Sequence, residues 1–214
     1  MQLAEIFLEK YLRTWRESDP SGTRGLGELL KHGANYFTGD YHEFWNNYPN
    51  QATLIQNSWT ESGRRQWRGP ARYLFRQFQH ANPERAAEPQ TFNVPPASCM
   101  IFDTRFHRGA GDTTFLSALQ MTRLHEWINE LNTRRWAGFL CLGQLIFEEA
   151  AGWALGTIVD RNLPDYAQYP ELVRALVTCQ QTLVILSGNV HYGRVARCRQ
   201  AHGPELYEVV SSPM

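Results

Sequence analysis

The sequence lacks an excess of charge of either sign, a long apolar run and a clustered set of cysteines. Lys plus Arg and Asp plus Glu each number 21, so no net charge draws the chain to nucleic acid or to an anionic membrane. The uncharged apolar stretches, such as residues 136–147, are too short to span a bilayer. The first 17 residues carry charges within their apolar pattern, unlike a secretory signal. We therefore expect a cytoplasmic protein, with any polyanion binding confined to a local patch.

The cysteines Cys99, Cys141, Cys179 and Cys198 are widely spaced and form no Cys-x-x-Cys or Cys/His cluster. This spacing favours buried free thiols over a disulfide or a zinc site, which agrees with a reducing compartment. With 43% hydrophobic and 13% aromatic residues among 214, the chain can bury a sizeable core. Its length suits a single domain over residues 1–214.

Apolar periodicity predicts helices near residues 3–15, 26–31, 56–85, 115–132 and 170–180. Apolar runs predict strands near residues 35–38, 99–102, 138–147, 182–186, 193–199 and 206–210. Pro70 is expected to start or break a helix, and the proline-rich segment 82–96 to form a surface loop. Strands and helices that alternate along the chain indicate a layered α/β fold with a covered sheet.

Polar residues follow predicted strands in segments 39–43, 103–105 and 187–191. Layered α/β proteins build their sites at such places, because the strand fixes the backbone and the loop exposes the side chain. Each segment taken alone is weak, since a single histidine after a strand is more often a hydrogen-bonded loop residue than a ligand. Their combination makes a functional site the stronger interpretation.

The strings GDYHEFWNNYP, FDTRFHR, LVILSGNVHYGRV and LYEVVSSPM occur in that order along the chain. They resemble motif blocks of the calcineurin-like metallophosphoesterases of the alkaline phosphatase D type, and the resemblance covers roughly the whole chain. It implies a layered α/β/β/α sandwich, of which this chain holds a large C-terminal portion that is incomplete at the N-terminus. It also implies metal-dependent hydrolysis of phosphate monoesters or diesters.

Enzymes of this class use two metal ions about 3.5–4 Å apart to polarise the phosphoryl oxygens and hold a hydroxide in line. By motif position, the resemblance makes His42 the catalytic histidine and places the metal ligands at His191, Asn189 and Asp40. It gives Glu43, Asp103 and Arg105 roles in orienting ligands or binding the phosphate. Structural roles remain open for several of them: Asp40 capping a turn, Glu43 paired with an arginine, Asp103 and Arg105 as a buried ion pair.

The sequence departs from the family pattern in ways that weaken the expected metal site. Tyr41 stands where the family has a metal-binding Asn or Asp, and a neutral phenol is a poor ligand except toward ferric iron. Asn189 stands where the late motif usually has Asp or His, and the family's early ligand blocks precede the region where this chain begins. We expect divalent or trivalent ions (Mn, Fe, Ca or Zn) to be held weakly. A homo-oligomer, or a complementary chain that carries the early motifs, would complete the site.

Two other interpretations stay open. A non-catalytic metallophosphoesterase-like subunit that binds a protein or a phosphate-containing ligand would tolerate the missing ligands. Nucleic-acid processing is the third, because Arg64, Arg65, Arg68, Arg72 and Arg76 could line a phosphate backbone. A solvated helix face is favoured over it, since the chain has no net positive charge.

Overall fold

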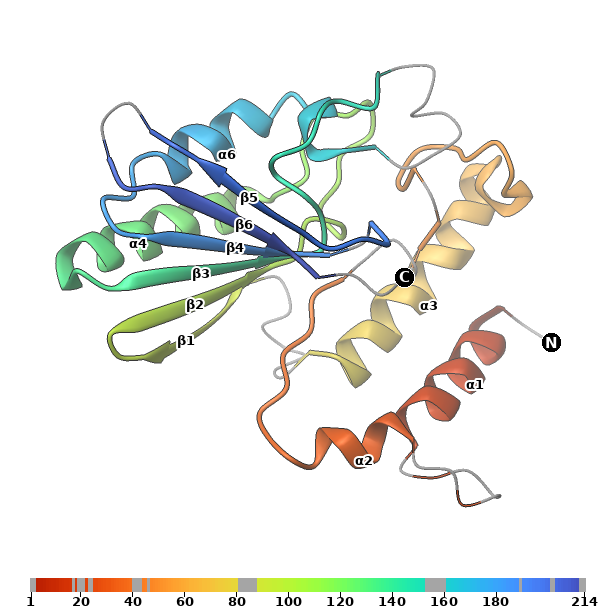
Figure 1. The fold of residues 1–214 in the computed structure, drawn as a ribbon. Helices are drawn as coiled ribbons and strands as arrows, with labels where there is room; N and C mark the ends of the chain where they lie inside the picture. The colour runs from red at the N-terminus through yellow and green to blue at the C-terminus, as the bar shows by residue number, and fades with distance from the viewer. Residues whose placement is uncertain are drawn as a thin grey trace.

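The computed structural model describes residues 3–16, 18, 22, 25–39, 44–45, 47–80, 88–152, 161–188, 190–200 and 203–211 of the chain. These residues form a mixed α/β fold around one six-stranded sheet, as the sequence predicted (Figure 1). The helices are α1 (Leu3–Trp15), α2 (Leu26–Leu30), α3 (Glu61–Phe78), α4 (Ala118–Arg134) and α6 (Tyr169–Leu176). Short 3-10 turns lie at Gln56–Ser58 and Leu163–Asp165. The strands are β1 (Gln90–Val94), β2 (Ala97–Phe102), β3 (Ala137–Leu142), β4 (Leu183–Ser187), β5 (Arg194–Cys198) and β6 (Leu206–Val210).

The strands lie in the order β1-β2-β3-β4-β6-β5. The central strands β2, β3, β4 and β6 are parallel, and β1 and β5 pair antiparallel at the two edges. Because parallel strands all point the same way, the chain leaves β2, β3, β4 and β6 at one common edge of the sheet. This carboxyl edge is where open α/β sheets usually place their binding sites.

Helices α4 and α6 cover one face of the sheet (Figure 1). Side chains alternate between the faces along each strand, and on this face Leu140, Leu183 and Ile185 are fully buried. They join the main core with Leu124, Leu131 and other residues of α4 and α6. The Trp127 indole donates a 2.8 Å hydrogen bond to the hydroxyl of Ser98, which fixes α4 over β2. This face is the hydrophobic centre of the molecule.

The opposite face of β3, β4, β6 and β5 is only partly buried. We call it the second face, and its residues are Phe139, Cys141, Val184, Leu186, Val195, Arg197, Tyr207 and Val209. Leu186 is 38% exposed and Val195 is 72% exposed, and none of the described helices packs on these residues. At the β1 side, Tyr36 stacks on Phe92 with ring centroids 4.3 Å apart. The sequence predicted a covered sheet, and within the described residues the face of β3, β4, β6 and β5 that lies opposite α4 is only partly covered.

Helices α1, α2 and α3 form a separate group beside the sheet (Figure 1). A second, aromatic core joins α3 to the segments around residues 44–52 and 106; its buried members are Phe44, Trp45, Tyr48, Ala52, Ala71, Phe75 and Phe106. The rings of Phe44 and Phe106 meet edge to face at 4.9 Å. Aromatic pairs of this kind add to the apolar burial. The aromatic block FWNNYP therefore anchors the first motif to the loop that follows β2.

Several local predictions were wrong. Residues 35–38 form no strand of the sheet. They contact it through side chains: the Gln90 amide donates to the Phe37 carbonyl at 3.0 Å. Pro70 lies inside α3 and neither starts nor ends it. The predicted surface loop contains β1, an edge strand that suits a proline-rich segment because one side of it needs no partner. Strand β3 ends at Leu142, so residues 143–147 form a loop.

All four cysteines are free thiols, as predicted, but only Cys179 is buried: Cys99 and Cys141 are partly buried and Cys198 is exposed. Burial raises the pKa of Cys141 to about 11, with the neighbouring Cys99 as the smaller cause. No helix in the described part of the chain is long and apolar enough to cross a membrane.

Candidate functional site

The carboxyl edge of the sheet brings three of the motif segments to one side of the molecule. Strands β2, β4 and β6 end at Phe102, Ser187 and Val210, where the motif strings FDTRFHR, GNVHYG and SSP begin or follow in the sequence. Adjacent strands lie about 4.8 Å apart, so the β2 and β4 ends, which are separated only by β3, are roughly 10 Å apart. Loops at this spacing can enclose a small substrate.

The first motif is anchored at the same edge by the residues on either side of it. The Thr38 hydroxyl donates to the Phe102 carbonyl at the end of β2. A Cβ at Gly39 would lie 2.6 Å from the ring of Phe106 and 3.6 Å from a carboxylate oxygen of Asp103, so only glycine fits this approach. Phe44 packs on the same ring of Phe106. The chain thus enters and leaves segment 40–43 beside the loop after β2.

The expected residues Asp40, Tyr41, His42 and Glu43, together with Asn189, lie outside the described residues. The structure places Asp103, Arg105 and His191. Our expectation that His42 and His191 share one cleft therefore stays a prediction.

Asp103 shapes the loop after β2. Its carboxylate accepts hydrogen bonds from the backbone N–H groups of Arg105 at 2.7 Å and Phe106 at 3.0 Å. Its backbone carbonyl accepts from the Gln120 amide in the first turn of α4 at 3.0 Å. Arg105 is fully buried, so in this conformation its guanidinium does not face solvent. Asp103 supports the fold of the loop through these bonds.

Two further basic residues of the same loop were not assigned a role from the sequence. Arg108 is buried; it donates to the Thr104 carbonyl at 3.2 Å and to the Gln144 side chain, which ties the loop after β2 to the loop after β3. His107 is half-buried. Burial is the main cause that lowers its pKa from the ordinary 6.5, and the nearby Arg72 and Arg76 guanidinium groups lower it further. Burial and the two neighbouring cations therefore both favour the neutral form of this imidazole.

His191 lies on the loop between β4 and β5, and its side chain is exposed. Its φ angle is 55°, in the left-handed region that non-glycine residues seldom adopt. Such a conformation persists only where the surrounding structure holds it. The loop around His191 is thus fixed by contacts at its ends.

Both residues that flank this loop bond to Glu208, which lies in the motif string LYEVVSSPM but was given no role from the sequence. Its side chain is 0% exposed, and its carboxylate accepts from the Ser187 hydroxyl at 3.0 Å and from the Arg194 guanidinium at 2.8 Å. It also accepts from the backbone N–H groups of Ile146 at 2.6 Å and Phe147 at 3.3 Å. The available signal was one charged residue within the apolar strand LYEVV, because a buried charge needs partners.

The described residues do not by themselves form a metal centre. Among them, no group of three or more His, Cys, Asp or Glu side chains is placed to hold a metal ion. The carboxylates of Asp103 and Glu208 at this edge are already bound to N–H and O–H donors of the protein. We therefore derive no reaction step through a metal from these residues.

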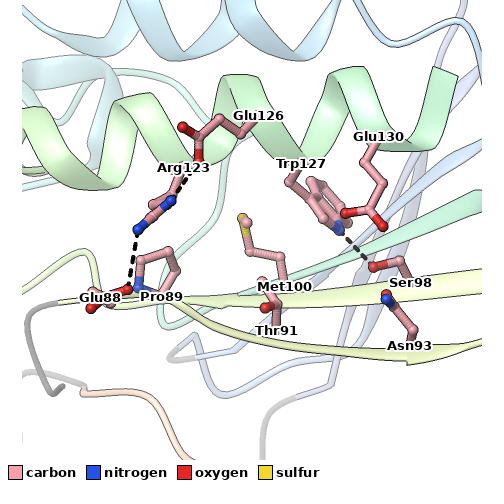
Figure 2. Close-up of a pocket in the computed structure, with 10 residues that line it drawn as sticks. All are labelled: Glu88, Pro89, Thr91, Asn93, Ser98, Met100, Arg123, Glu126, Trp127 and Glu130. Atoms are coloured by element: carbon pink, nitrogen blue, oxygen red, sulfur yellow. Dashed lines mark hydrogen bonds and ion pairs between the residues drawn. The ribbon is translucent and has the colours of Figure 1, made fainter. Parts of the chain in front are cut away.

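A separate pocket of about 280 Å³ lies between α4 and the β1–β2 hairpin (Figure 2). It is lined by Glu88, Pro89, Thr91, Asn93, Ser98, Met100, Arg123, Glu126, Trp127 and Glu130. Arg123 lies between Glu126 at 2.7 Å and Glu88 at 3.6 Å, and Glu130 pairs with Arg134 at 2.8 Å. Its charged side chains thus already have partners, either in the pocket or at Arg134, and it contains none of the motif residues.

Comparison with known proteins adds no assignment. No protein-family model matches the chain, and no curated protein matches it significantly. The resemblance to metallophosphoesterases therefore rests on the motif strings alone.

Proposed function

We propose that the chain is a metal-dependent phosphoesterase that hydrolyses phosphate monoesters or diesters, with a dinuclear metal site that another chain completes. The observation that carries the proposal is the meeting of the motif segments at the carboxyl edge. The residues that flank segment 40–43, the loop that begins at Asp103 and the loop that carries His191 all lie there. The parallel strands bring the loops after β2 and β4 to this edge, and the bond of Thr38 to Phe102 brings the first motif there, so the three segments are placed where they can form one site.

In this proposal His42 is the catalytic histidine, and His191, Asn189 and Asp40 supply metal ligands. Glu43, Asp103 and Arg105 orient those ligands or the phosphate. The metal polarises the phosphoryl group when it is bound. Tyr41 and Asn189 lower the anionic charge around the ions, which is why we expect weak affinity for Mn, Fe, Ca or Zn.

The second face supports the part of the proposal that concerns a partner. Half-exposed apolar side chains of β3, β4, β6 and β5 lie side by side on one surface, and a contiguous patch of that kind usually marks an interface. A second sheet packed there would give the α/β/β/α layering. Either a second copy of this chain or a complementary chain would supply it.

The test is hydrolysis of p-nitrophenyl phosphate and bis-p-nitrophenyl phosphate by the purified chain, with each metal titrated to millimolar concentration. We expect weak hydrolysis that saturates only at high metal, and its loss in His42→Ala and His191→Ala. Elemental analysis of protein purified without chelator should find clearly less than two metals per chain. A full complement of tightly held metal would show that ligands other than those named here form the site.

The runner-up is a non-catalytic subunit with the same fold. The bonds that hold Asp103 within its loop and the burial of Arg105 favour it, because both groups already serve the structure. Absence of hydrolysis with every metal, in protein whose fold is intact, would select this alternative.

A further inference from the structure

A single carboxylate holds both ends of the loop that carries His191. The loop spans residues 188–193 between β4 and β5. Ser187, the last residue of β4, donates its hydroxyl to one oxygen of Glu208 at 3.0 Å. Arg194, the first residue of β5, donates to the other oxygen at 2.8 Å. The residues at the two ends of the loop are therefore linked through one side chain of β6.

The same carboxylate also fixes the neighbouring loop. The backbone N–H groups of Ile146 and Phe147 donate to it, and Arg194 in turn donates to the Phe147 carbonyl at 2.6 Å. The Tyr169 hydroxyl of α6 donates to the Ile146 carbonyl at 2.9 Å. Bonds to a charged group are shorter and stronger than neutral ones. Glu208 thus links the loops after β3 and β4 into one unit.

Stability alone does not account for a charge at this position. Glu208 lies in register with Ile185 on the face that α4 and α6 cover, where the other buried strand residues are mostly apolar. A buried ion pair is often no more stabilising than apolar residues of similar volume. What the carboxylate supplies, and an apolar side chain cannot, is directed bonds to Ser187, Arg194 and two backbone N–H groups.

We propose that Glu208 is a positioning residue of the candidate site. It holds the 188–193 loop, and with it the left-handed backbone at His191, in the orientation that the site requires. Its effect passes through Ser187 and Arg194, and it does not itself contact the substrate. The consequence for activity rests on the proposed function, whereas the consequence for the loop does not.

The test is the variant Glu208→Gln, which keeps one acceptor oxygen and nearly the same volume but removes the charge. Glu205→Gln is the matched control, because Glu205 is a carboxylate that directly precedes the same strand and pairs with Arg197 of β5 at 2.5 Å, away from the loop. Amide hydrogen exchange is followed for the loop, for residues 146–147 and for the interior of α4. The spectroscopic signature is the imidazole resonance of His191 in a two-dimensional NMR spectrum.

In Glu208→Gln we expect exchange to rise at least tenfold at residues 188–193 and 146–147, with a shifted His191 resonance and unchanged protection in α4. Glu205→Gln should change neither. If the chain hydrolyses phosphate esters, Glu208→Gln should lower kcat while KM stays within about twofold. Loss of protection in α4 by the same factor as in the loop would overturn the proposal, since it would make Glu208 a core residue only. Unchanged exchange at residues 188–193 in Glu208→Gln would also overturn it.

Ser187→Ala and Arg194→Lys carry the same test if Glu208→Gln does not fold, because each weakens one of the bonds to the carboxylate. Both should loosen the loop while α4 stays protected. A chain without hydrolytic activity whose loop nevertheless loosens would reject the proposed function and keep the positioning role. If the chain hydrolyses phosphate esters but none of the three variants changes exchange in the loop, the proposed function is kept and the positioning role of Glu208 is rejected.

Discussion

At the scale of single residues, close packing decides which side chains the sheet accepts. Gly138 in β3 lies beneath α4, and a Cβ there would be 2.6 Å from Leu131 Cδ1, 2.8 Å from Leu183 Cδ1 and 3.0 Å from Trp127 Cη2. These neighbours belong to the main core. The missing side chain therefore lets α4 approach the sheet, and extra volume at this point must displace buried atoms.

Gly138→Ala is expected to lower the free energy of unfolding by about 1–3 kcal/mol, because one methyl group overpacks a filled core. Gly33→Ala is the control, since no atom lies within 4 Å of its Cβ position and its φ is not positive. We expect Gly33→Ala to raise the free energy of unfolding by about 0.4–1 kcal/mol, because alanine lowers the conformational entropy of the unfolded chain. Urea unfolding measures both. Equal effects of the two changes would contradict the packing argument.

The lowered pKa of His107 predicts how stability depends on pH. Burial first, and then Arg72 and Arg76, hold the native pKa below the ordinary 6.5, so the unfolded state binds the proton more readily. The contribution of His107 to the free energy of unfolding is fully present above pH 6.5. It is lost as the pH falls below that value, until the pH has passed the native pKa as well.

His107→Gln should flatten the dependence of the urea midpoint on pH below about pH 7, because it removes the group whose native pKa is lowered. Arg76→Gln should flatten it in part by raising the native pKa of His107. A slope that survives His107→Gln would assign the pH dependence to other groups.

At the scale of elements, the start of α4 is coupled to the candidate site. The Ser117 side chain accepts from the Gln120 N–H at 3.2 Å, and the Gln120 side chain accepts from the Ser117 N–H at 2.9 Å, a capping box. Gln120 also donates to the Asp103 carbonyl, and its side chain is 1% exposed. One glutamine thus begins the helix and holds the loop after β2.

Ser117→Ala is expected to cost about 1 kcal/mol of stability, the usual value of an N-cap. Gln120→Ala should cost more, about 2 kcal/mol, because it leaves a buried carbonyl without its donor. Thr122→Ala, which removes an exposed hydroxyl on the same helix, should change stability by less than about 0.5 kcal/mol. Chemical denaturation followed by circular dichroism measures the series. A smaller loss for Gln120→Ala than for Ser117→Ala would argue against the coupling.

At the scale of the whole molecule, the sheet has one face under helices and a second face of half-exposed apolar side chains. Leu186 and Val195 are 38% and 72% exposed there. Uncovered apolar area favours association. The second face is therefore where the proposed partner should lie.

We expect sedimentation velocity at micromolar concentration to show a dimer or a larger species, and Leu186→Glu with Val195→Glu to dissociate it. Leu119→Glu is the control, because Leu119 is 42% exposed on α4, which covers the other face. A monodisperse monomer in the unsubstituted chain would reject the part of the proposal in which another chain completes the metal site. Dissociation by Leu119→Glu alone would move the interface to the helical face.

The amino-acid sequence by itself determined the local elements. Apolar periodicity located α1, α4 and α6, and short apolar runs located β2, β4 and β6, because the spacing of apolar residues is a property of the chain. Strand β1 was missed, and the helix predicted near residues 56–85 is found as α3 but without the predicted start or break at Pro70. Proline marks a local preference that an edge strand or a packed helix can override. Local sequence patterns thus predict individual helices and strands but not how these elements pack.

Only the tertiary structure decided which distant groups meet. That Ser187, Arg194 and the backbone at Ile146 share one carboxylate follows from the order of strands in the sheet, which no local pattern contains. The same holds for Gly39 against Phe106 and for the half-exposed second face. Pairing of strands and covering of faces are settled by the burial of the whole chain at once. The motif string LYEVVSSPM contained Glu208, but the bonds that this residue makes to the ends of the His191 loop became visible only in the folded sheet.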